Sequence, residues 1–426
     1  MKILTSQNLT IREISEKLRR PGGKSAQIVR TVKNLMNRVR KDGDRALFEF
    51  AQRFDGVKLR SLAVSKKEVR EAYEWVDARL MRALKRAKRN IERFHKHHIQ
   101  RKERSVETEK GVTVWREFRP IERVGLYVPG GKAAYCSTVL MLAVPARVAG
   151  CHDVVMTTPP DKKGRCNPNV IVAADLCGIE NIYKIGGAQA IAAMAFGTET
   201  VPKVYKIFGP GNHYVTTAKM LVYGVVDIDM PAGPSELLVL ADETGDPRWI
   251  AADLLAQLEH GEDSQGVLVT PSQTLAEQAI RELRRQTERS PRSEIIRKSL
   301  RNSFVIVVNS FDEACLIANE YAPEHLEIVA KTQEGILKRI TNAGSVFLGS
   351  YASESLGDYA TGANHTLPTS GFSKMFSPLS AQAFGKMMQV QKVSRRGVEN
   401  LRETVETIAI SEGLHGHSDA VKIRLG

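Results

Sequence analysis

The chain has 426 residues, of which 42% are apolar and 26% charged, and its formal net charge is +14. This length exceeds what one hydrophobic core usually serves, so two or three domains are expected, and the composition excludes extensive disorder. The positive charge would suit nucleic acid, an anionic surface or a phosphate-bearing ligand, and charge alone does not choose among them.

Cysteine usage and hydropathy indicate the compartment. The five cysteines are an odd number and form no CxxC pair, which argues against a disulfide framework or a cysteine zinc knuckle. The N-terminus lacks the apolar core of a signal peptide, and no apolar run approaches the roughly 18 residues of a membrane span. We therefore expect a cytoplasmic protein that does not engage a membrane.

The first hundred residues have mainly helical patterns. Thr10 and Glu13 form a capping box before an apolar-periodic stretch, which the breaker Pro21-Gly22-Gly23 ends. Amphipathic spacing continues over residues 25–54, and a long basic helix is expected over residues 73–100. Its charged side chains are interpreted as a solvated helix face, and its histidines His95, His97 and His98 as surface residues.

From Pro120 onward, short apolar runs bounded by Gly and Pro alternate with helical stretches. This alternation predicts βαβ units and parallel sheets, with ligand loops at the carboxyl ends of the strands. A second α/β stretch begins near Ser235, and the last fifty residues, from about Pro378, look largely helical. The predicted fold class is α/β, with two Rossmann-like domains that have parallel-sheet cores and with small helical N-terminal and C-terminal segments.

Three glycine-rich loops follow predicted strands: Pro129-Gly130-Gly131-Lys132, Gly186-Gly187-Ala188-Gln189 and Gly209-Pro210-Gly211-Asn212. Such loops let backbone amides approach an anionic ligand at the start of a helix. None of the three matches the GxGxxG fingerprint of dinucleotide-binding proteins, and each alone is consistent with a structural turn. Together they favour a ligand-binding face.

Polar residues in four further segments suggest a metal and acid–base chemistry. Gln257 and His260 lie three residues apart on a predicted helix, and Asp358 and His365 share a glycine-punctuated loop. A third group is found in Glu412-Gly413-Leu414-His415-Gly416-His417. Glu324 and His325 follow Pro323 at a predicted helix start, where an imidazole and a carboxylate would exchange protons with a substrate.

Eight blocks in order give the chain a resemblance to the histidinol dehydrogenase family, and the match is densest from Arg123 to His417. The blocks are RVGLYVPGGKAAYCSTVLM, IGGAQAIAAMAFGT, FGPGNHYV, DMPAGPSELLVLAD, LAQLEHG, YAPEHLEI, GDYATGANHTLPT and EGLHGHSDAV. The resemblance implies a zinc-dependent, NAD-linked, four-electron oxidation of L-histidinol through L-histidinaldehyde to L-histidine, the last step of histidine biosynthesis.

Carried over position by position, the resemblance also implies the site residues. The zinc ligands would be Gln257, His260, Asp358 and His417, with one zinc per subunit. The catalytic acid–base residues would be Glu324 and His325, and the NAD contacts Tyr127, Gln189 and Asn212. The substrate contacts would be Ser235, Gln257, His260, Glu324, His325, Asp358, His365, Glu412 and His417.

The same resemblance implies an intertwined homodimer with shared active sites, in which Glu412 and His417 act in trans. We accordingly divide the chain into a helical N-terminal segment (1–23), a metal-binding and catalytic α/β domain (24–126 and 237–377), an NAD-binding α/β domain (127–236) and a C-terminal dimerisation segment (378–426). Two departures from the family pattern adjoin the substrate pocket, at Ala352-Ser353 and in residues 372–386.

Three alternatives stay open at this stage. A relative with the same metal and base would oxidise another small amino or sulfonated alcohol. A zinc hydrolase would use the same ligands but leave the three glycine-rich loops without a role. A nucleic-acid-binding protein would account for the basic charge, although no nucleic-acid-binding module is recognisable, and we expect no nucleic-acid partner.

Overall fold

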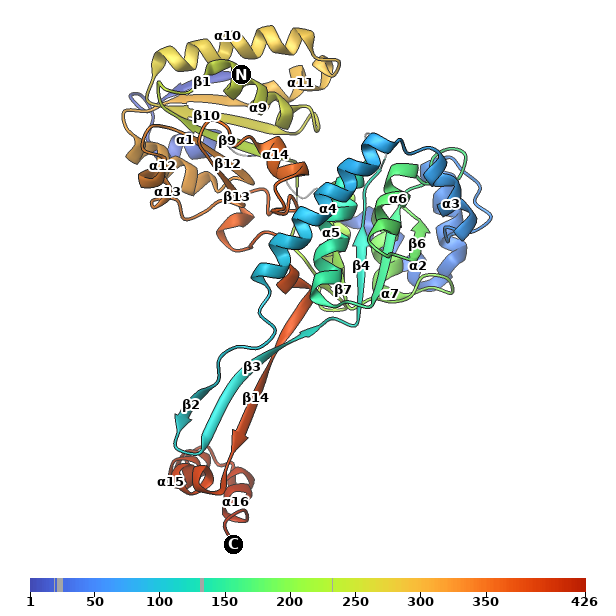
Figure 1. The fold of residues 1–426 in the computed structure, drawn as a ribbon, viewed down its shortest axis with the longest axis vertical. Coiled ribbons are helices and arrows are strands. Elements are labelled where there is room, and N and C mark those ends of the chain that lie inside the picture. The colour runs from blue at the N-terminus through green and yellow to red at the C-terminus, as the bar shows by residue number, and fades with distance from the viewer. Residues whose placement is uncertain (19, 21–25, 131–133, 232) are drawn as a thin grey trace.

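The computed structural model describes residues 1–18, 20, 26–130, 134–231 and 233–426. Two α/β units lie side by side, and a long arm extends from them to the C-terminus (Figure 1). The breaker at residues 21–23 and part of the first glycine-rich loop, residues 131–132, lie outside the described residues. The predicted fold class, two α/β units with parallel sheets, is confirmed.

The first unit is built on a six-stranded parallel sheet in the order β1-β11-β10-β9-β12-β13. Its strands are β1 (Lys2–Thr5), β9 (Glu236–Ala241), β10 (Gln265–Thr270), β11 (Phe304–Val307), β12 (His325–Val329) and β13 (Ser345–Leu348). Its helices are α1 (Ile11–Lys17), α9 (Pro247–Leu258), α10 (Gln273–Arg289), α11 (Ser293–Ser299), α12 (Phe311–Tyr321), α13 (Gln333–Leu337) and α14 (Glu354–Tyr359).

Strand β9 shows why the strands of this sheet are apolar at successive positions. Leu238 and Leu240 pack into one buried cluster, whereas Leu237 and Val239 pack into another on the opposite face. Successive side chains of a strand point to opposite faces, so a sheet covered on both sides needs apolar residues at every position.

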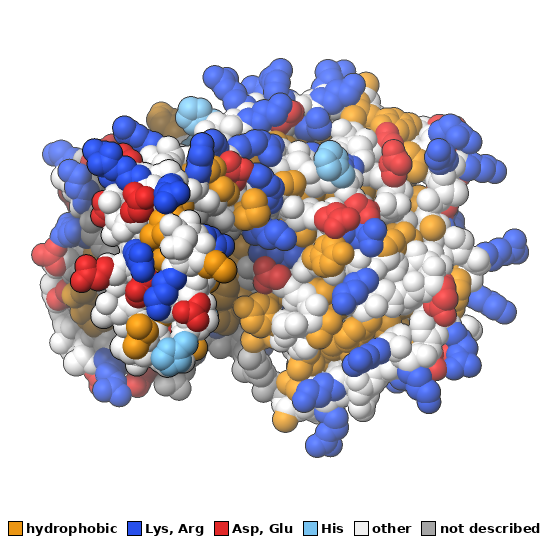
Figure 2. Space-filling view, turned by 90° about the horizontal axis from the view of Figure 1, so that it is seen from below, with side chains coloured by type: hydrophobic (Ala, Val, Ile, Leu, Met, Phe, Trp, Pro, Cys, Tyr) orange, Lys and Arg blue, Asp and Glu red, His pale blue; other side chains and the backbone are white. Residues whose placement is uncertain are grey.

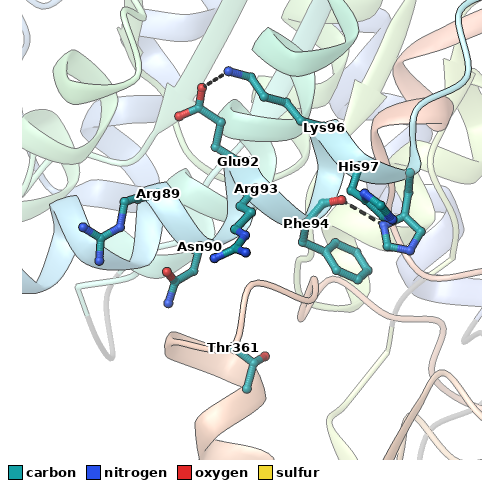
Figure 3. A pocket seen from close by; sticks show the side chains of 9 residues that line it. Arg89, Asn90, Glu92, Arg93, Phe94, Lys96, His97 and Thr361 are labelled. Atoms are coloured by element: carbon teal, nitrogen blue, oxygen red, sulfur yellow. Dashed lines mark hydrogen bonds and ion pairs between the residues drawn. The ribbon is translucent and has the colours of Figure 1, made fainter.

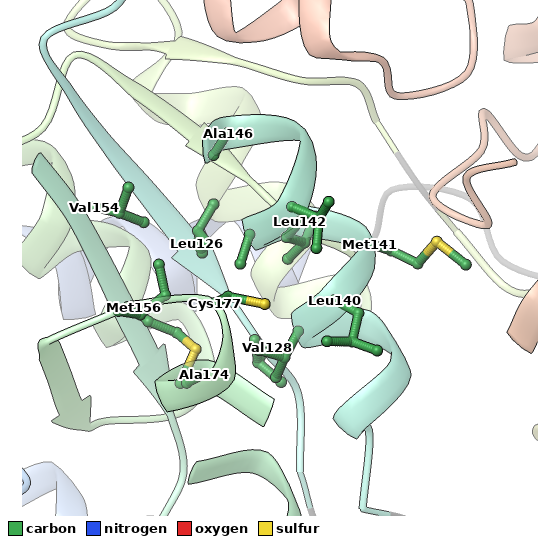
Figure 4. Close-up of a cluster of buried hydrophobic side chains, with 14 of the residues drawn as sticks. Leu126, Val128, Leu140, Met141, Leu142, Ala146, Val154, Met156, Ala174 and Cys177 are labelled. Atoms are coloured by element: carbon green, nitrogen blue, oxygen red, sulfur yellow. The ribbon is translucent and has the colours of Figure 1, made fainter. Parts of the chain in front are cut away.

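The second unit is a five-stranded parallel sheet in the order β6-β5-β4-β7-β8. Its strands are β4 (Arg123–Tyr127), β5 (Asp153–Thr158), β6 (Asn181–Lys184), β7 (Lys206–Phe208) and β8 (Asp227–Ile228). Its helices are α2 (Ala26–Phe50), α3 (Lys66–Glu74), α4 (Ala78–His98), α5 (Cys136–Ala149), α6 (Pro168–Leu176), α7 (Gly187–Phe196) and α8 (His213–Val222). Figure 4 shows α5 packed on β4 and β5, with Leu126, Leu142 and Met156 in one buried cluster.

The arm is an antiparallel ribbon followed by two helices. It comprises β2 (Val106–Glu109), β3 (Val112–Pro120), β14 (Gly385–Val393), α15 (Arg395–Ser411) and α16 (His415–Lys422). Strand β14 pairs with β3 along its whole length, from Gly385 opposite Pro120 to Val393 opposite Val112. Short 3-10 or π turns occur at Ala51–Asp55, Leu300–Asn302, Phe372–Lys374 and Ala381–Phe384.

Three sequence expectations need correction. Residues 24–126 were assigned to the first unit, but α2 packs on α7 and α8, α3 on α6 and α4 on α5, all in the second. The N-terminal segment is not wholly helical, because β1 pairs with β11 at the edge of the six-stranded sheet. Strand β14 lies in the segment expected to be largely helical; most of its side chains are exposed, so it lacks the alternation that marks a half-buried strand.

Among the described residues, the structure contains no helix both long and apolar enough to cross a lipid bilayer. Lys and Arg side chains are spread over much of the face seen in Figure 2 and are interspersed with acidic ones. In α4, the long basic helix, the buried residues are Leu84, Ile91 and His95, which agrees with the interpretation of its charged side chains as a solvated face.

Candidate active site

The predicted ligand pair on α9 lies at the end of that helix. Asp246 caps α9 through the backbone N–H of Arg248, and Pro247 opens its first turn. Gln257 is fully buried in the last turn, and His260 lies just beyond the cap residue Glu259. A helix that returns antiparallel to its sheet ends at the amino edge of the strands, so this pair faces the start of β9 and β12.

Helix α14 brings two carboxylates to the same place. Ligand atoms of His260, Glu354 and Asp358 lie within 4.8 Å of one another. Glu354 and Asp358 are four residues apart and so share one face of the helix. Glu354 was missed as a site residue in the sequence analysis, although its spacing from Asp358 carried that signal.

Glu354 also determines how the Gln257 amide is oriented. With its nitrogen toward Glu354, the amide donates to the two carboxylate oxygens at 2.5 and 3.1 Å; the reverse orientation would set oxygens against each other. The Gln257 oxygen therefore points away from Glu354. An amide oxygen, an imidazole and a carboxylate are together a donor set that zinc accepts, so these residues fit the implied metal.

The acid–base pair lies at the start of a strand rather than at the helix start predicted from Pro323. Chain direction changes at Ala322, which has a positive φ of 52°, and His325 begins β12. The Glu236 backbone holds both residues: its N–H donates to Glu324 Oε2 at 2.8 Å, and its carbonyl lies 3.2 Å from His325 Nδ1. Glu324 Oε2 and His325 Nδ1 are 3.7 Å apart.

Burial and neighbouring charges perturb both groups. Burial raises the pKa of Glu324 to about 8, although the charge of His325 and the Glu236 N–H oppose the shift. Burial alone would lower the pKa of His325, but Glu354, Glu324 and Asp358 outweigh it and raise that pKa well above its usual value. A buried acid and base this close together can exchange protons with a bound substrate.

Asp358 and His365 extend the same cluster. Asp358 Oδ1 lies 3.5 Å from His325 Nε2, an atom that is buried and has no hydrogen-bond partner among the described residues. Burial tends to raise the pKa of Asp358, but the nearby His325 outweighs burial and lowers it. His365 Nδ1 lies 3.0 Å from the Asp358 carbonyl, and burial lowers the pKa of its imidazole.

His365 also marks the boundary between the two units. Its Nε2 lies 3.3 Å from Thr138 Oγ1 of α5, and Asn364 Nδ2 donates to the Met141 carbonyl at 2.6 Å. We call the group formed by Gln257, His260, Glu324, His325, Glu354, Asp358 and His365 the metal-side cluster. This cluster belongs to the first unit and adjoins the second. Ser235, half-buried, directly precedes β9 and so lies at the same strand edge as Glu236.

The predicted NAD contacts come together at the carboxyl edge of the five-stranded sheet. Tyr127 ends β4, and its hydroxyl accepts the Gly187 N–H at 3.1 Å, at the start of the helix that carries Gln189. Asn212 caps α8 through the N–H groups of Tyr214 and Val215. Gly209, with a φ of 122°, lies so close to the Tyr127 carbonyl that a Cβ there would be 2.1 Å from its oxygen. These contacts hold the loops after β4, β6 and β7 next to one another.

Glu412 and His417, a predicted substrate contact and a predicted zinc ligand, are not brought by the chain to the cluster of His260, Glu324, His325 and Asp358. Both are exposed, at the end of α15 and in α16, and the arm places these helices at the opposite end of the molecule from α9 and α14 (Figure 1). Within one chain, the cluster therefore holds three of the four predicted zinc ligands.

A groove of about 1060 Å³ lies between α4 and the end of α14 (Figure 3). Its walls are side chains of α4, mostly basic or polar but including Glu92 and Phe94, together with Thr361. Asn90 Nδ2 donates to the Ala360 carbonyl at 2.7 Å. His97 and His98 are exposed, as expected. His95 was predicted at the surface but is buried, and burial lowers its pKa to about 4, so its imidazole is neutral.

Comparison with known proteins gives one consistent result. The family model described as histidinol dehydrogenase matches residues 18–425. A histidinol dehydrogenase of Bacteroides thetaiotaomicron is 49% identical over 96% of both chains, and one of Methanocaldococcus jannaschii is 45% identical over 100% of this chain and 99% of its own. The crystal structure of a histidinol dehydrogenase from Elizabethkingia anophelis is 43% identical and covers 100% of this chain and 98% of its own, with a TM-score of 0.96.

Proposed function

The chain belongs to the histidinol dehydrogenase family, and on that premise we propose that it oxidises L-histidinol through L-histidinaldehyde to L-histidine with two molecules of NAD. The observation that carries this proposal is the buried pair of Glu324 and His325 beside a donor set that suits zinc. Both lie in the first unit, close to its boundary with the second unit. The reaction consumes one water and two NAD for each alcohol oxidised to the acid.

In the proposed reaction, the neutral form of His325 would accept the alcohol proton, and bound NAD would supply the acceptor for the hydride from the substrate carbon. Glu324 would then take a proton from the water that adds to the aldehyde, and His325, once it has released its first proton to solvent, would serve as base again in the second oxidation. Tyr127, Gln189 and Asn212 position the cofactor. Ser235 and His365, together with Glu412 of the partner subunit, contact the substrate.

Gln257, His260 and Asp358, together with His417 of the partner subunit, would hold one zinc. When bound, zinc supplies an orienting template for the substrate nitrogens. We propose a homodimer with shared sites because the arm holds Glu412 and His417 away from the chain's own cluster. A cytoplasmic location is proposed because all five cysteines are free.

The test is spectrophotometric NADH formation from histidinol by the purified protein, with and without a chelator. We expect two NADH for each histidinol, loss of activity on chelation, and recovery on adding zinc. A single NADH, or faster oxidation of another amino or sulfonated alcohol, would support the alternative that a related alcohol is the substrate. NAD-independent hydrolysis would contradict the oxidoreductase proposal.

A further inference from the structure

Arg20 lies in the N-terminal segment, to which no function has been assigned, and it reaches into the first unit. Its guanidinium binds the Glu236 carboxylate with two nitrogens, Nε to Oε1 at 2.7 Å and Nη2 to Oε2 at 2.8 Å. The Glu236 residue is 1% exposed, so its charge needs a partner, and Arg20 provides one in the geometry that arginine favours.

The same guanidinium also holds the chain that leads into the acid–base pair. Arg20 Nη2 donates to the Tyr321 carbonyl at 2.6 Å, and the guanidinium lies 3.9 Å from the centre of the Tyr321 ring. Ala322, the residue with positive φ, follows Tyr321 directly and precedes Pro323, Glu324 and His325. Arg20 therefore holds both Glu236, at the start of β9, and Tyr321, just before the turn that leads into β12.

Glu236 links Arg20 to the acid–base pair. Its side chain is held by Arg20 and by the Ser370 N–H at 2.7 Å, while its backbone N–H and carbonyl contact Glu324 and His325. A shift of the Glu236 peptide would move both groups together. Misplacement of reacting groups by about 1 Å can cost about 100-fold in rate.

We propose that Arg20 is a positioning residue of the active site, which acts through Glu236 to align Glu324 and His325. The inference rests on the proposed function. It assigns to the N-terminal segment a role in turnover that differs from metal binding, since the predicted zinc ligands of this chain come from α9 and α14 and the contacts of Arg20 are to β9 and to the end of α12.

The test compares Arg20→Met and Arg20→Lys with the wild-type protein at saturating NAD. For Arg20→Met we expect kcat to fall about 10- to 100-fold, while KM for histidinol and the zinc content stay within about twofold. Arg20→Lys keeps the charge but loses the two-pronged contact, so its kcat should lie between the other two. Arg12→Met is the matched control: Arg12 pairs with Glu16 on the exposed face of α1, and its loss should leave kcat unchanged.

A second readout does not depend on the substrate. In protein labelled with ¹⁵N-histidine, the hydrogen-bonded Nδ1–H signal of His325, assigned by its loss in His325→Gln, should weaken or shift in Arg20→Met and persist in Arg12→Met.

Wild-type kcat with an unchanged His325 signal in Arg20→Met would overturn the inference. So would a loss of zinc in proportion to kcat, which would indicate a general structural defect. If Arg20→Met does not fold, unchanged kcat and signal in Arg20→Lys would overturn it equally. Absence of any turnover by the wild-type protein would instead contradict the proposed function, and the His325 signal would still decide the role of Arg20.

Discussion

The metal-side cluster and the C-terminal arm carry predicted site residues in opposite surroundings. In the cluster, Gln257, Glu324 and His325 are buried, and each has partners from other elements of the same chain. On the arm, Glu412 and His417 are exposed, and so are apolar residues such as Ile410 and Ile423. A buried polar group must be satisfied where it lies, whereas exposed apolar residues on an extended arm are typical of a surface that another chain covers. In the proposed homodimer, the part of the site in the cluster is built by folding and the part on the arm by association.

The largest expected effect distinguishes a base in the cluster from a ligand on the arm. His325→Ala should lower kcat by about 10³-fold, within the range for loss of a general base, while zinc content stays near one per subunit. His417→Ala should lower zinc content together with activity, because a ligand is lost. Zinc analysis by mass spectrometry and steady-state kinetics check both. If zinc fell in step with activity in His325→Ala, the assignment of His325 as a base would be wrong.

The next effect tests association directly. An inactive His417→Ala chain and an inactive Asp358→Ala chain are mixed, unfolded and refolded together. A hybrid dimer has one site in which both residues are intact, so a hybrid should show half of wild-type activity. Random pairing makes about half of the dimers hybrids, so the mixture should recover about a quarter of wild-type activity. No recovery in hybrids verified by affinity tags would place the whole site within one chain.

The features that the sequence predicted are mainly those that burial determines. The apolar strands of both sheets were predictable because they are buried on both faces, and the loops at Gly186 and Gly209 were recognised from their glycines. Glu324 and His325 were identified as residues, but not their place at the start of β12, because Pro323 also fits a helix start. Strand β14 was missed because its side chains are mostly exposed on both faces. The packing of α2 to α4 on the second sheet depends on long-range contacts that local periodicity does not encode.

The site residues show the same limit. The spacing of Glu354 from Asp358 places both on one face of a helix, but the role of Glu354 depends on contacts with Gln257 and with Glu327, whose Oε1 accepts the Glu354 backbone N–H at 2.8 Å. Arg20 gave no sequence signal, because its partner Glu236 is 216 residues away. Motifs identify residues that touch ligands, whereas the residues that hold them are found only when distant segments meet.

The smallest expected effect concerns the stability of the cluster. The carboxyl groups of Asp253 in α9 and Glu327 in β12 interact, and burial raises the pKa of Asp253 to about 6 and that of Glu327 to about 8. Both are above the ordinary carboxyl value, so the folded state favours the protonated forms and loses stability as pH rises from about 4 through 8. Asp253→Asn is neutral at every pH. Its gain in stability over the wild-type protein should be larger at pH 8 than at pH 5 by about 1 kcal/mol, after allowance for partial solvent access.

Urea denaturation at pH 5 and pH 8, at matched protein concentration, measures this difference. The control on the arm is Glu399→Gln, which removes an exposed pair with Arg395 and should change stability by no more than about 0.5 kcal/mol. A gain for Asp253→Asn at pH 8 that is absent in the control would show that ionisable groups of the folded cluster, unlike those of the arm, are held at an energetic cost. An equal gain at both pH values would mean that ionisation of Asp253 is not its cause.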